Sequence, residues 1–138
     1  MGAWGAGNLE NDGAQDELAN VCDELFDKVI ELLNHPHAHE YDDEPIDQLF
    51  VRIEMIFALH ERKMITVSPP IGKLDPLLRS YVERWDRYCR EAGNGAWPER
   101  QMVIEATFDK LRSIADGSAE DGLSHRLGLI AEKMSKPT

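Results

Sequence analysis

Three histidines at alternate positions, His35, His37 and His39, have the clearest capacity for chemistry, and Glu40 follows them directly. Imidazole nitrogens and carboxylate oxygens are ligands for Zn²⁺, Ni²⁺ or Cu²⁺. Alternate side chains of an extended segment point to opposite sides, so two of the three imidazoles would converge on one ion. The same residues are also typical of a solvated loop, or of a pH-responsive patch in which nearby carboxylates raise histidine pKa values.

Stronger signatures of metal binding or catalysis do not accompany this segment. The sequence has no CxxC pair, and the HExxH pattern that His60 and Glu61 would begin has Met64 in place of its second histidine. No nucleophile is paired with a base, and Cys89 occupies an apolar helix position where its thiol would pack in a core. The sequence favours a protein that is not an enzyme and has no cofactor, with a divalent metal on the histidines as the alternative.

Acidic residues are concentrated in the first part of the chain. Residues 1–54 contain 14 Asp and Glu but only two basic residues, Lys28 and Arg52. The whole protein has a formal net charge of −11, so its excess of negative charge lies in this first part. A surface of this kind repels nucleic acid and anionic membranes and accelerates encounter with a basic protein. The acids that we expect to bind such a partner are Asp16, Glu17, Asp23, Glu24, Asp27, Glu31, Asp42, Asp43, Glu44 and Asp47.

Apolar residues recur at helical spacing over most of the chain. This spacing predicts an all-α, single-domain bundle of about five helices behind a segment rich in glycine and tryptophan at 1–11. We expect helices at 12–34, 45–63, 75–92, 98–116 and 119–135. Residues 64–67 have strand character but no partner strand, so we expect a connection that packs on the core.

Capping residues and prolines predict where the helices begin. Asp12, with Gln15 three residues later, predicts the start of the first helix. Proline lacks the N–H that a first helical turn leaves unbonded, so each of three prolines predicts the start of a helix. These residues are Pro45, Pro76 and Pro98.

The size and composition are those of one globular domain. The chain has 138 residues, of which 42% are hydrophobic and 30% charged, enough for a single core. No apolar run approaches the ~20 residues needed to cross a bilayer, and the N-terminus lacks the features of a signal peptide. Cys22 and Cys89 both fall at apolar helix positions, as buried thiols of a reducing compartment do. We therefore expect a cytoplasmic protein, whose oligomeric state the sequence leaves open.

The N-terminal segment has the most distinctive motif, MGAWGAGNLENDGAQD over residues 1–16. Glycines beside a tryptophan allow the backbone to turn tightly while the indole anchors the N-terminus to the core. In this order the residues resemble a family of short, mostly bacterial proteins of unassigned function that open with M-G-x-W-G-x-G-x-x-x-N-D-x-A-x-D. The matching residues are Gly2, Trp4, Gly5, Gly7, Asn11, Asp12, Ala14 and Asp16, whereas Leu9 stands where an aromatic residue is usual.

The resemblance implies no catalytic residue and no cofactor. It does imply a context, because small proteins of this kind are often encoded near bacterial toxin–immunity pairs. With the acidic surface, it leads us to expect an immunity or antitoxin-type inhibitor that covers the active cleft of a basic toxin such as a nuclease. The alternative is a small metal-binding or enzymatic protein that uses the loop with His35, His37 and His39.

Overall fold

The computed structural model describes residues 3–41, 43–91 and 97–117. Four helices follow one another along the chain: α1 (Asp12–Leu33), α2 (Glu44–Glu61), α3 (Ile71–Glu91) and α4 (Pro98–Asp116). Within these ranges there is no β-strand, and Ala3 and Asn11 form an isolated antiparallel bridge. The all-α prediction is confirmed, whereas the fifth helix expected at 119–135 lies outside the described residues and stays a prediction.

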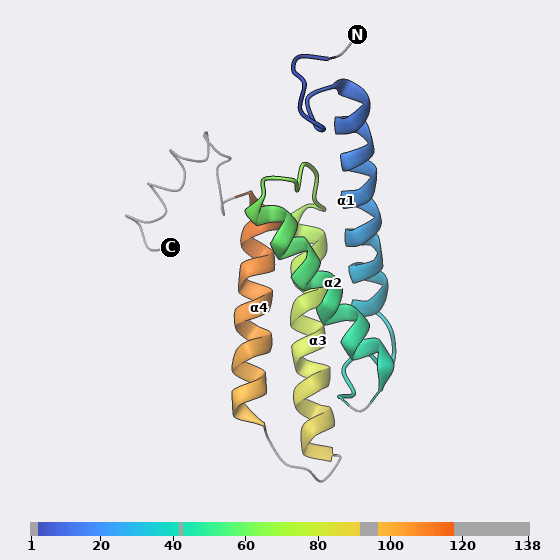
Figure 1. Cartoon of the computed structure of the whole chain (residues 1–138). Coiled ribbons are helices and arrows are strands. Elements are labelled where there is room, and N and C mark those ends of the chain that lie inside the picture. Colours follow the sequence, from blue (N-terminus) through green and yellow to red (C-terminus); the bar gives the residue numbers. More distant parts are fainter. Residues whose placement is uncertain (1–2, 42, 92–96, 118–138) are drawn as a thin grey trace, which may run out of the picture.

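The four helices form one bundle (Figure 1). α3 and α4 run antiparallel side by side, and α2 crosses in front of α3 in this view (Figure 1). α1 packs mainly along α2 and also contacts α3. The N-terminal end of α1 projects beyond the ends of the other helices (Figure 1), and Leu18 is its first buried residue.

Apolar side chains from all four helices meet in a single core. At the edge of this core the partly buried Phe50 of α2 stacks on the buried Phe108 of α4, with ring centroids 5.8 Å apart. Tyr81 of α3 meets both rings edge-on, at 6.0 Å and 5.4 Å. Aromatic pairs of this geometry contribute about 0.5–1.5 kcal/mol beyond the burial of their area. The three rings therefore join α2, α3 and α4.

The cap of α1 differs from the predicted pair. Asn11, not Asp12, is the N-cap, and its side-chain oxygen accepts a hydrogen bond from the Ala14 N–H at 2.7 Å. Gln15 donates its side-chain amide to the Leu9 carbonyl at 2.8 Å and does not close a capping box. Asparagine caps about as well as aspartate, and Asn11 has the extended backbone that an N-cap requires. The predicted helix is confirmed to within one residue at each end.

α2 begins as the sequence predicts. Asp43 is its N-cap and accepts from the Glu44 N–H at 2.8 Å, and Pro45 lies in the first turn. After α2 the chain passes through a connection that contacts the core, as expected. There Ile65 packs against buried residues, and the buried Cys22 thiol donates to the Met64 carbonyl at 3.3 Å.

The predicted start of α3 is wrong. The helix begins at Ile71 and not at Asp75, so Pro76 lies inside it. The Pro70 carbonyl accepts from the N–H groups of Lys73 and Leu74 at 3.0 and 3.2 Å, which closes a turn directly after the Pro69-Pro70 pair. Leu74 is fully buried, and its packing stabilises the added turn. The free energy gained by this burial offsets the loss of the backbone hydrogen bond that an internal proline removes.

α4 has both of the ends that the sequence predicts. Pro98 lies in its first turn, and Gly117 follows its last residue. Gly117 has a φ of 75°, in the left-handed region that favours glycine, and its N–H donates to the Ile114 carbonyl at 3.1 Å. The helix therefore ends at this residue.

Candidate functional site

The histidines lie in the short loop between α1 and α2, and this loop is bound to α3. The Tyr81 hydroxyl donates a hydrogen bond of 2.7 Å to the carbonyl of Ala38, and both residues are buried. Burial raises the pKa of the Tyr81 phenol, so the hydroxyl remains a protonated donor. The middle of the loop is thereby held in place.

The loop gathers His37, Glu40 and Asp43 at one point. His37 Nδ1 lies 2.9 Å from a carboxylate oxygen of Glu40, and one donor atom from each of the three residues lies within 4.8 Å of the others. Their hydrogen bond and the charge of Glu40 raise the pKa of His37. One nitrogen and two carboxylate donors suit a divalent cation that completes its coordination with water.

The other two histidines lie outside this cluster. His35 Nδ1 accepts a hydrogen bond from the backbone N–H of His37 at 3.0 Å. His39 turns toward α3, where its ring meets Tyr88 edge-on at 5.7 Å. Its Nδ1 is buried and has no hydrogen-bond partner within the described ranges. The structure thus combines one histidine of the predicted set with two carboxylates that follow it in the sequence.

His39 has the opposite electrostatic environment from His37. Burial and the positive charge of Arg84 lower the pKa of His39, although Glu40 acts in the other direction. His37 is exposed, and there the hydrogen bond and charge of Glu40 dominate. The pKa values of these two histidines of one loop are therefore shifted in opposite directions from the ordinary value.

Arg84 of α3 is a further residue of the site, and no local motif in the sequence points to it. Its guanidinium donates to the carbonyls of Leu33 and His35, where α1 ends. A cation at the C-terminus of a helix is favoured by the helix dipole. The same guanidinium lies 5.7 Å from the centroid of the Tyr81 ring. One available signal was its place three residues after Tyr81 on the same helix, which puts both side chains on one face.

Six of the predicted partner-binding acids share one face of α1, which we call the acidic face. On a wheel of 3.6 residues per turn they fall within an arc of about 120° and span about 22 Å along the helix. All six are exposed, opposite the residues that α1 buries. In the described part of the chain, one ion pair involves this face, from Lys28 to Glu31 at 3.3 Å. The acidic face consists of Asp16, Glu17, Asp23, Glu24, Asp27 and Glu31.

The remaining four predicted acids fall in different places. Asp43 caps α2 and belongs to the cluster with His37 and Glu40. Glu44 is exposed in the first turn of α2, and Asp47 borders a groove between α2 and α4. Asp42 lies outside the described residues.

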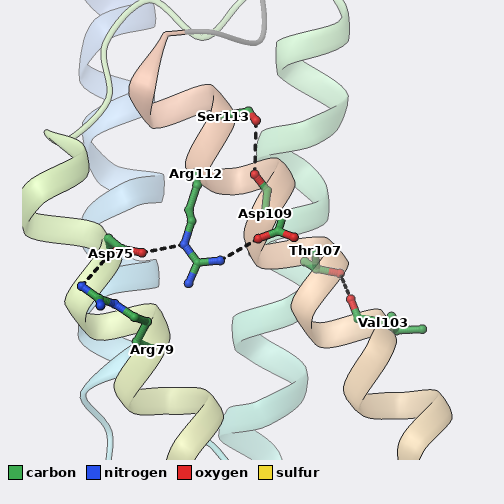
Figure 2. Close-up of polar contacts among 7 residues, drawn as sticks. All are labelled: Asp75, Arg79, Val103, Thr107, Asp109, Arg112 and Ser113. Atoms are coloured by element: carbon green, nitrogen blue, oxygen red, sulfur yellow. Dashed lines mark hydrogen bonds and ion pairs between the residues drawn. The ribbon is translucent and has the colours of Figure 1, made fainter. Parts of the chain in front are cut away.

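A second group of charged side chains connects α3 to α4 (Figure 2). Arg112 donates to Asp75 at 2.6 Å and to Asp109 at 2.8 Å, while the other oxygen of Asp75 pairs with Arg79 at 2.8 Å. Each carboxylate in this group faces an arginine, so the charges compensate one another. We interpret the group as a clamp between two helices.

Comparison with known proteins does not identify the chain. No family model, curated protein or solved structure matches it. None of the described helices is both long and apolar enough to span a membrane. The geometry of the loop and of the acidic face is therefore the basis for a functional proposal.

The expectation that Trp4 anchors the N-terminus to the core is wrong. The indole is 60% exposed, because the segment before α1 folds on itself. The backbone N–H of Trp4 donates to the Glu10 carbonyl at 3.0 Å, and the Glu10 carboxylate accepts from the backbone N–H of Gly7 at 2.8 Å. A Cβ on Gly5 would overlap that carboxylate, so glycine is required for this close approach. The segment before α1 lies at the projecting end of that helix (Figure 1). Trp4, in this segment, is left exposed to solvent.

The two cysteines are buried free thiols, as predicted. Burial and the charge of Asp86 raise the pKa of Cys89, which favours the unreactive thiol over the thiolate. The Cys22 thiol donates a hydrogen bond to the Met64 carbonyl, in the connection after α2. Both residues therefore serve packing in this structure.

Proposed function

We propose that this protein is an immunity or antitoxin-type inhibitor that binds a basic toxin, such as a nuclease, and covers its active cleft. The observation that supports the proposal is the acidic face of α1, whose six carboxylates are exposed with one ion pair among the described residues. A nuclease cleft is basic because it binds phosphates, and a row of carboxylates offers it similar charges. The resemblance to short bacterial proteins agrees with a role in the bacterial cytoplasm.

Charge on this scale acts chiefly on the rate of association. Complementary potentials raise association rates by about 10–10³-fold at low salt, and the increase falls as ionic strength rises. Most of the affinity of such a complex comes from apolar anchors at its centre. Trp4 is a suitable anchor, because its side chain is exposed in the segment that precedes α1.

The experiment compares two variants with equal loss of charge. The first neutralises the acidic face through Asp16→Asn, Asp23→Asn, Asp27→Asn and Glu31→Gln. The control neutralises four exposed acids on other helices through Glu61→Gln, Glu83→Gln, Glu99→Gln and Glu105→Gln. Each tagged protein is used to capture partners from a bacterial lysate at low salt and at about 0.5 M salt, where the Debye length is only a few ångströms.

The proposal expects wild type and control to retain one basic protein in equal amount, and the acidic-face variant to lose it. Added wild-type protein must then inhibit the nuclease or toxic activity of the purified partner at one-to-one stoichiometry. Equal capture by both variants, or a partner whose activity is unaffected, would contradict the proposal.

A second candidate function is binding of a divalent metal by the loop between α1 and α2. It is favoured by one observation, the convergence of donor atoms from His37, Glu40 and Asp43. This set differs from the three histidines that the sequence suggests. Binding there would link the end of α1 to the first residues of α2 and so stabilise the loop.

A further inference from the structure

An apolar groove runs between α2 and α4. It has a volume of about 500 Å³, and its lining includes Val51, Met55 and Ala58 of α2 and Val103 and Thr107 of α4. Three of these side chains are half exposed or nearly so: Val51 at 56%, Met55 at 48% and Val103 at 51%. Apolar side chains that are exposed side by side in this way are typical of an interaction surface.

The two sides of the groove carry charges of opposite sign. On α2 these are the carboxylates of Asp47 and Glu54, which line the groove. On α4 they are Arg100 and Lys110, each of which lies over a phenylalanine ring of α2, at 4.7 and 4.5 Å from its centroid. Glu99, which precedes Arg100, is not part of the lining. Within the described ranges, none of the four groove charges forms an ion pair.

We propose that a second copy of this chain covers the groove, so that the protein forms a symmetric homodimer through α2 and α4. The two-fold axis of this dimer runs along the groove. Rotation about such an axis exchanges the two sides of the groove, and it therefore places α2 of one copy over α4 of the other. The apolar side chains of both copies are then buried between the four helices.

This arrangement brings opposite charges together. α2 and α4 advance toward the same end of the bundle (Figure 1), and Asp47 and Arg100 both belong to the first turns of their helices. A rotation about the groove keeps the level of each residue along the axis, so Asp47 of one copy meets Arg100 of the other. Further along the groove, Glu54 approaches Lys110 in the same way. An axis across the groove would instead place α2 on α2 and carboxylates against carboxylates, which is unfavourable.

A second copy suits this surface better than a partner of one predominant charge. The four charges of the groove sum to zero, so the groove as a whole attracts neither a basic nor an acidic protein, whereas a second copy offers an opposite charge to each of them. The groove also needs no polar partner for Thr107. Figure 2 shows that its hydroxyl donates to the Val103 carbonyl, at 2.7 Å.

Sedimentation equilibrium of the full chain tests this dimer. An interface of two helices per copy is at the small end of specific interfaces, so wild type should change from monomer to dimer between about 5 and about 500 µM. Asp47→Lys and Arg100→Glu should each raise the Kd of the dimer at least about tenfold, because each places like charges opposite one another. The control Glu105→Lys alters a carboxylate on the side of α4 that faces α3, and it should dimerise like wild type.

An equimolar mixture of Asp47→Lys and Arg100→Glu is the decisive sample. Each variant carries two like charges at this end of its own groove, so neither can form the pair within one chain. In the mixed dimer, each altered residue meets the opposite charge of the other copy. The mixture should therefore dimerise with a Kd close to that of wild type.

Three results would overturn the proposal. The first is a wild-type protein that stays monomeric at the highest concentration, whether another part of the chain or a different protein then fills the groove. The second is a mixture that associates no better than its two components. The third is a dimer that persists in the double variant Val51→Asp, Val103→Asp, because its interface then lies elsewhere. No residue of the acidic face contributes to this dimer, so its failure would leave the proposed toxin binding untouched.

Discussion

Tyr81 of α3 donates its hydroxyl to the carbonyl of Ala38 at 2.7 Å, and this bond holds the loop between α1 and α2 on α3. The ring of Tyr81 is itself positioned by Phe50 and Phe108. The loop that carries His37 and Glu40 is therefore fixed by the same side chain that completes the aromatic core.

Replacing Tyr81 by Phe should destabilise the protein without altering the packing of the ring. The Ala38 carbonyl is then buried without its partner, and we expect the free energy of unfolding to fall by about 1–3 kcal/mol. Urea denaturation measures this change. Ser80→Ala, at the exposed neighbouring position, should stay within about 0.5 kcal/mol of wild type. A wild-type midpoint for Tyr81→Phe would show that the bond makes no net contribution.

Arg84→Gln should raise the pKa of His39. The positive charge of Arg84 is, after burial, the largest cause of the lowered pKa of that imidazole. NMR titration of the His39 ring protons measures the change. Arg87 acts in the same direction but more weakly, so Arg87→Gln should give the smaller increase. Equal increases from the two substitutions would contradict the conclusion that the charge of Arg84 has the larger effect on the pKa of His39.

His39 should make the protein less stable as the pH falls. Its pKa in the folded state is lower than the value of about 6.5 expected for the unfolded chain. The unfolded state therefore binds more protons below about pH 6.5, and stability is lost as the pH falls from there toward the folded pKa. In chelator-treated protein, wild type should lose more stability than His39→Gln between pH 7.5 and 5.5, as measured by urea denaturation.

His37 supplies the opposite control for this titration. Its folded pKa is raised, so its contribution to stability is complete below the unfolded pKa and is lost as the pH rises through the folded value. Relative to wild type, His37→Gln should therefore be more destabilised at pH 5.5 than at pH 7.5. The same pH dependence of stability in both variants would show that Glu40 and burial do not shift the pKa values of the two imidazoles in opposite directions.

Zn²⁺ should stabilise the protein through His37, Glu40 and Asp43. At a free concentration 100 times Kd, binding to the folded state alone adds about 2.7 kcal/mol, which a thermal melt detects as a higher Tm. His37→Asn should abolish the increase, and His35→Asn should retain it because His35 lies outside the cluster. Loss of the increase in His35→Asn, with retention in Glu40→Gln, would favour the set of three histidines instead.

Local spacing was enough to predict the helices and the two faces of α1. A helical period places the acidic face opposite Leu18 and Cys22 whatever the rest of the protein does. The ends of α4 also follow from its own residues, since Pro98 and Gly117 act within one turn of the helix. The start of α3 could not be predicted in this way, because the burial of Leu74 decides it.

The sequence by itself therefore determined the all-α class, the amphipathic faces and a loop rich in histidine. Only the tertiary structure decided which of those histidines meets a carboxylate and which one turns toward α3. That choice depends on Tyr81 and Arg84, which lie far along the chain from the loop and reach it only after the helices have packed. Periodicity describes neighbours one turn apart, whereas contacts of this range are set by how the faces of different helices fit together.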